Sequence, residues 1–100
     1  MLVTGVPECC EVAWRAWHMD ALYVGAFIEE VDMHDIEVAI DITSHEDIIS
    51  VYEELLKGSR NHLRSFVSKI EAEGVVYKAQ YLTQEEVDAI VDTSMERGSI

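Results

Sequence analysis

The sequence predicts an all-α fold, a long two-helix hairpin followed by one short C-terminal helix. The 100 residues include a single proline and five glycines, which favours long uninterrupted elements over a fold with many turns. Apolar residues recur three or four positions apart over long stretches, the spacing of a helix face. The hydrophobic content of 49% is too high for a disordered acidic chain. We therefore expect a tail over 1–7 and one helical domain over 8–98.

The first helix is expected over about 8–39, after Pro7, whose missing N–H costs little at a helix start. A break near His18–Asp20 is one expectation, because Asp20 can act as an N-cap. The apolar stripe expected to be buried on this helix is Val24, Phe27, Ile28, Val31 and Val38. Asp35 falls within this stripe, and Glu30 and His34 flank it, whereas Glu29, Asp32 and Glu37 are expected to be solvated.

The second helix is expected over about 45–73. Ser44 with Asp47 resembles a capping box at its start, and Gly74 is a suitable residue to end it. Its apolar stripe is Ile48, Val51, Tyr52, Leu55, Leu63, Phe66 and Ile70. Ser59 and His62 lie within that stripe, and the opposite, solvent-facing side carries Glu53, Lys57, Arg60 and Arg64.

The remainder of the chain predicts an extended segment and a third helix. Residues 75–82 are too few and too isolated to build a sheet. Thr83 with Glu86 forms a second capping-box pattern. The helix that follows is expected over about 84–97, ending before Gly98.

Charge narrows the function classes. The chain has 20 acidic and 7 basic side chains, a formal net charge of −13. This excludes binding to nucleic acid by phosphate neutralisation and argues against docking on an anionic membrane. The sequence contains no apolar run of membrane-spanning length and no signal-peptide pattern, so we expect a cytoplasmic protein.

Polar groups near the middle of both expected apolar stripes support two hypotheses. A carboxylate on a buried face is costly unless it is paired or binds a metal. Inward-facing carboxylates and histidines are how helical bundles hold metals. The same groups could instead form a hydrogen-bond network at a helix–helix contact that sets register.

Three segments resemble one prokaryotic ferritin-like family known as a domain of unknown function. DALYVGAFIEEVDMHDI (20–36) resembles the third bundle helix of that family, and VYEELLKGSRNHLRSF (51–66) resembles the fourth. QYLTQEE (80–86) is similar to its C-terminal extension. The resemblance covers roughly residues 20–90 and implies half of a four-helix bundle with a di-iron or di-manganese carboxylate centre.

The resemblance implies roles for individual residues. Glu30 is the candidate carboxylate ligand of iron or manganese, and His62 is the candidate imidazole ligand. Asp35, His34 and Ser59 would support these ligands from behind. Ser59 stands where the general ferritin-like pattern has a glutamate, which departs from a symmetric two-metal site.

The family's two upstream helices have no counterpart in residues 1–19, so the bundle must be completed by a second chain. We expect a homodimer, or else another helical chain that supplies the missing half. The favoured function is a homodimeric helical interaction module with a degenerate metal site. The alternative is a metal-binding protein with oxidase, peroxide-handling or storage chemistry, and enzymatic activity is left open. A third hypothesis is metal or redox sensing through the adjacent Cys9 and Cys10.

Overall fold

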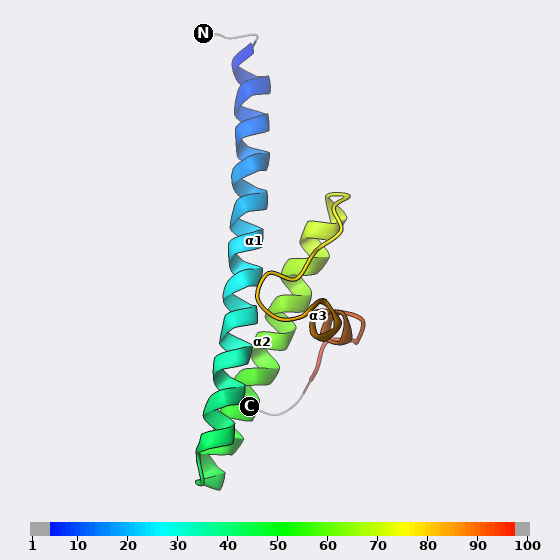
Figure 1. Cartoon of the computed structure of the whole chain (residues 1–100). Helices are drawn as coiled ribbons and strands as arrows, with labels where there is room; N and C mark the ends of the chain where they lie inside the picture. The colour runs from blue at the N-terminus through cyan, green and yellow to red at the C-terminus, as the bar shows by residue number, and fades with distance from the viewer. Residues whose placement is uncertain (1–4, 98–100) are drawn as a thin grey trace.

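The computed structural model describes the backbone of residues 5–97 and the side chains of residues 17–97. It contains helices α1 (Gly5–Ile42), α2 (Glu46–Ala72) and α3 (Gln84–Val91), with no strand in the part described. Helices α1 and α2 form an antiparallel hairpin, and α1 extends well past the end of α2 (Figure 1). The all-α hairpin with a short third helix is therefore confirmed.

The long helices differ from expectation at their ends. Helix α1 runs through His18–Asp20 without a break. The N-cap of α2 is His45, which makes no side-chain capping bond. The Ser44–Asp47 capping box is wrong, because the Asp47 carboxylate accepts a hydrogen bond from the next amide, that of Ile48, at 3.0 Å. Gly74 does follow the end of α2, with a positive φ of 88°.

The capping box of α3 is confirmed. Thr83 Oγ1 accepts from the Glu86 amide at 3.1 Å, and Glu86 Oε1 accepts from the Thr83 amide at 3.0 Å. The predicted extent to residue 97 is wrong, since α3 ends at Val91. Residues 92–97 instead turn back toward α2, where they are held by the ion pairs described below.

An extended segment, residues 75–82, crosses one face of the hairpin on its way to α3 (Figure 1). We call it the strap. The carboxylate of Glu30, fully buried, accepts hydrogen bonds from the strap amides of Gln80 (3.1 Å), Tyr81 (2.7 Å) and Leu82 (2.8 Å). The Tyr77 hydroxyl donates to the same carboxylate. Burial and this contact raise the pKa of Tyr77 well above its usual range.

A second polar network ties the C-terminal segment to α2. Arg64 Nε donates to the Ile90 carbonyl at 2.8 Å, and its Nη1 lies 2.9 Å from a Glu96 oxygen. Arg60 binds both oxygens of Glu96 at 2.6 Å. These contacts hold the pKa of Glu96 at about 2, mainly through the Arg60 hydrogen bond. Arg64 is thus buried, which corrects the expected solvent exposure: it satisfies the carbonyl at the end of α3.

The core lies between the hairpin, the strap and α3. Its buried apolar members are Leu22, Ala26, Met33, Leu63, Val67, Ile70, Tyr77 and Val87. Gly25 lets α2 approach α1 closely, since a Cβ there would stand 2.5 Å from the Phe66 ring.

The stripe expected to be buried on α1 is wrong. Val24, Phe27, Ile28 and Val38 are 40–57% exposed. The buried face of α1 is instead a set three or four residues apart on the other side of the helix, Leu22, Ala26, Glu30 and Met33. Helix α1 is thus apolar on two sides. The side that packs in this chain combines small and polar residues with Leu22 and Met33, so counting large apolar residues selected the other side.

Two glycines of α2 and its end provide a matched stability test. We expect Gly74→Ala to lower the free energy of unfolding by about 1 kcal/mol, because its left-handed φ strains any residue with a Cβ. Gly58→Ala is expected to raise it by about 0.5–1 kcal/mol, because Gly58 lies within a helix and a Cβ there meets nothing within 4 Å. Urea denaturation of both variants measures the two signs, and equal shifts would contradict the assignment.

The Glu30 carboxylate is expected to be the main polar stabiliser of the strap. Glu30→Gln should lower the free energy of unfolding by about 2–4 kcal/mol, because an amide NH₂ would face amide donors with no acceptor between them. Hydrogen exchange at Tyr81 and Leu82 should accelerate. The control is Glu53→Gln, an exposed change on α2 expected to shift stability by less than about 0.5 kcal/mol. Equal effects of the two substitutions would refute this role.

Candidate functional site

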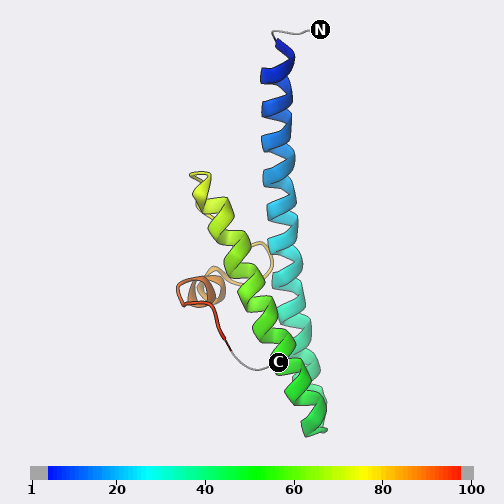
Figure 2. The same ribbon diagram turned by 180° about the vertical axis from the view of Figure 1, so that it is seen from behind.

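The hairpin has an uncovered side. The strap and α3 lie against one side, and on the reverse side no other segment crosses α1 and α2 (Figure 2). We call this reverse side the open face. The Phe66 ring packs on Gly25, and His62 pairs with Glu29, which marks the line where the two helices meet on this side. Helical spacing from that line assigns to the open face Val24, Ile28 and Asp32 of α1 and Ile48, Val51, Leu55, His62 and Phe66 of α2.

A polar cluster of Glu29, Ser59 and His62 lies at the centre of the open face. His62 Nδ1 stands 3.4 Å from Glu29 Oε2. The Glu29 side chain is 13% exposed, whereas that of His62 is 68% exposed. Burial raises the pKa of Glu29, and Asp32 adds to this, while His62 and the Ser59 hydroxyl oppose it. The imidazole and an oxygen of a partly buried carboxylate are therefore accessible together from one side.

Glu29 is the functional candidate that the sequence interpretation missed, because it was expected to be solvated. It belongs to the series Leu22, Ala26, Glu29 and Met33, whose spacing of three and four residues follows the contact with α2. That series was the available signal. It was overlooked because its apolar members are fewer and smaller than those of the exposed stripe.

The structure does not bring Glu30 and His62 together. Both residues are described, and no hydrogen bond or ion pair joins them. The two Glu30 oxygens already accept from the Tyr77 hydroxyl and three strap amides. A metal at Glu30 would have to displace these donors, so its carboxylate does not fit a ligand role in this arrangement.

The remaining predicted residues are placed in two ways. Ser59 is buried and its hydroxyl interacts with Glu29, so it does support the cluster that contains His62. Asp35 does face an imidazole, but that of His34, at 3.3 Å and in an exposed position. The His34 ring also packs edge-on against Tyr81. His34 and Asp35 thus form a separate surface pair.

Glu29 and His62 are the right donor types for iron or manganese, but two ligands hold no metal firmly. Within residues 17–97, no three His, Cys, Asp or Glu side chains gather into a metal-binding group. Cys9 and Cys10 lie outside the residues whose side chains are described. Further ligands would have to come from another copy or another chain.

The cluster borders a recess on the open face. A cavity of about 350 Å³ is lined by Glu29, His62, Ser65, Phe66 and Lys69. Lys69 brings a positive charge to the same recess as the Glu29 carboxylate. Across the described residues, no helix is both long enough and apolar enough to span a membrane.

Comparison with known proteins identifies relatives of this arrangement. The chain is 50% identical over 80 residues to the uncharacterized protein MJ0754 of Methanocaldococcus jannaschii, covering 80% of this chain and 43% of that protein. The crystal structure of the hypothetical protein MJ0754 matches with a TM-score of 0.74 and 49% identity, covering 78% of this chain and 45% of that one. The chain thus spans less than half the length of this relative.

A family model described as an uncharacterized protein domain, DUF2202, matches residues 13–94. This supports the resemblance to a domain of unknown function, while its ferritin-like character stays a prediction. Because the match covers most of the sequence, including the hairpin, the strap and α3, the chain belongs to the DUF2202 family.

Proposed function

We propose that this chain is a homodimeric helical module in which the open faces of two copies pack together to complete a four-helix, ferritin-like bundle. The observation that carries the proposal is the apolar character of the uncovered side. Val24, Ile28, Val51 and Leu55 are 48–59% exposed, and they come from both helices of the hairpin. Large apolar side chains concentrated on one side of a small domain typify an interaction surface.

The sequence pattern of α1 supports a helical partner. The positions 17, 21, 24, 28, 31, 35, 38 and 42 alternate in steps of four and three, the spacing of a coiled-coil seam. Most of them are apolar, and Asp35 is the one acidic residue among them. A polar residue at one such position sets register and partner number at some cost in stability.

A second copy is favoured as the occupant for two reasons. The relative is more than twice as long as the segment it shares with this chain, so a half-length chain has no equivalent sequence to cover the face by itself. A two-fold axis pairs each patch with its own copy, which a hairpin carrying apolar residues on both helices satisfies. The acidic composition supports the absence of a nucleic-acid partner, and we keep a cytoplasmic location as part of this proposal.

Dimerisation can be tested by placing a charge on the open face. Leu55→Glu should raise the monomer–dimer Kd at least about tenfold, because a carboxylate would be buried without a partner. Sedimentation velocity over a concentration series measures this. The control is Val76→Glu, an equally drastic change at an exposed strap position on the other side. A wild-type chain that is monomeric throughout, or equal weakening by both variants, would refute the proposal.

The alternative function is binding of iron or manganese, which the pairing of Glu29 with His62 favours. In the proposed dimer, two copies of each would approach the axis and supply two carboxylates and two imidazoles. A bound redox metal would supply oxidase, peroxide-handling or storage chemistry. This chain's residues would ligate it through Glu29 and His62, while Ser59 would orient Glu29 and the apolar rim would exclude water.

Metal content distinguishes the alternative from the degenerate-site form of the proposal. Protein purified without chelator should carry about half an ion per chain if one ion occupies the dimer, and His62→Ala should remove it. His45→Ala, at the exposed start of α2, is the matched control and should retain the metal. Elemental analysis reads both. A metal-free dimer rejects the alternative and leaves the interaction module.

A further inference from the structure

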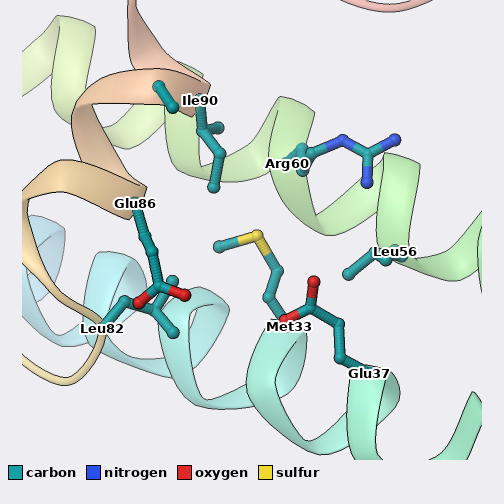
Figure 3. A pocket seen from close by; sticks show the side chains of 8 residues that line it. Met33, Glu37, Leu56, Arg60, Leu82, Glu86 and Ile90 are labelled. Carbon is teal, nitrogen blue, oxygen red and sulfur yellow. The ribbon is translucent and has the colours of Figure 1, made fainter. Parts of the chain in front are cut away.

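A second recess lies on the covered side of the hairpin, away from the open face. It has a volume of about 230 Å³ and lies where α1, α2, α3 and the strap meet. Its apolar lining is Met33, Leu56, Leu82, Ala89 and Ile90. Met33 is 2% exposed and forms the deep part of the recess. Figure 3 shows the Met33 thioether between α1 and the overlying helices, with space around it.

Two carboxylates stand at this recess, those of Glu37 from α1 and Glu86 from α3. They lie on either side of the Met33 side chain (Figure 3). Glu37 makes no hydrogen bond or ion pair with any described residue. Glu86 uses Oε1 to cap α3 through Thr83, and that capping lowers its pKa, so the group is ionised at neutral pH. Its Oε2 is left available.

The recess contains one cationic group, Arg60, whose charge is already balanced. Its Nε and Nη2 both bind the Glu96 carboxylate at 2.6 Å. With Arg60 and Glu96 paired, Glu37 and Glu86 leave the recess with a local excess of negative charge. The net charge of −13 adds a long-range field that attracts cations. An apolar pocket with a few convergent polar groups is the usual form of a small-molecule site.

We propose that this recess binds a small linear aliphatic amine. The alkyl chain would pack on Met33, Leu56 and Ile90, and the ammonium group would lie between Glu37 and Glu86. The site is independent of the proposed dimer interface, because it lies on the side that the strap and α3 cover. A carboxylic acid of the same length is disfavoured by both carboxylates, and an alcohol lacks the charge that they attract.

The proposal can be tested with n-butylammonium as the probe and n-butanol and n-butyrate as matched comparisons. The ¹³C-methyl resonance of Met33, assigned by its loss in Met33→Leu, reports directly on the recess. We expect n-butylammonium to shift it saturably in the millimolar range, n-butanol to bind at least about threefold more weakly, and n-butyrate not to bind. Equal shifts from the alcohol, or a shift from the acid, would overturn the assignment.

Variants separate the two carboxylates from general electrostatic attraction. Glu37→Gln and Glu86→Gln should each weaken n-butylammonium binding by about two- to fivefold, the range for exposed ion pairs. Glu85→Gln, a neighbouring exposed position of α3 outside the lining, should leave affinity unchanged. Ala89→Leu, at an exposed lining position, should abolish binding by filling the recess. A wild-type chain whose Met33 signal never moves, or a Glu85→Gln effect equal to that of Glu37→Gln, would contradict the proposal.

Discussion

The buried Glu30 carboxylate is the interaction on which the one-sided architecture depends. A charge placed at the hairpin's interior must be satisfied, and here four donors satisfy it, all from the strap. Bonding three consecutive strap amides holds that segment across α1 and α2. It thereby sets where Thr83 starts α3 and brings α3 to Arg64. The covered side is thus organised by a polar contact between distant parts of the sequence.

Covering one side this way leaves the other side to a different solution. The hairpin is apolar on both sides, but one strap and one short helix cover a single side. A lone pair of helices with an exposed apolar side is marginal, because a chain of this length buries a modest share of its surface. Association is the remaining source of burial. The exposed residues of both helices and the Glu29–His62 pair between them are the features that an added pair of helices would meet.

The sequence predicted local features and missed those made by long-range contacts. Three helices, the capping box at Thr83 and the end at Gly74 follow from nearby residues and were correct. The buried side of α1 was assigned wrongly, because helical period cannot say which of two apolar sides faces the hairpin partner. Arg64 was placed in solvent because its acceptors, Ile90 and Glu96, lie 26 and more residues away.

The same limitation explains the candidate site. Glu29 and Glu30 are neighbours in sequence, and a helix turns about 100° between them, so one faces the open side and the other faces the strap. The resemblance selected Glu30, yet the donors around Glu30 come from residues 77–82, which no local pattern links to it. His62 was selected correctly as an accessible imidazole, and its partner was off by one position. For adjacent carboxylates on a helix, the decisive information is which side each neighbouring segment occupies. In this chain the strap removes Glu30 from chemistry and leaves Glu29 available to a ligand or a second copy.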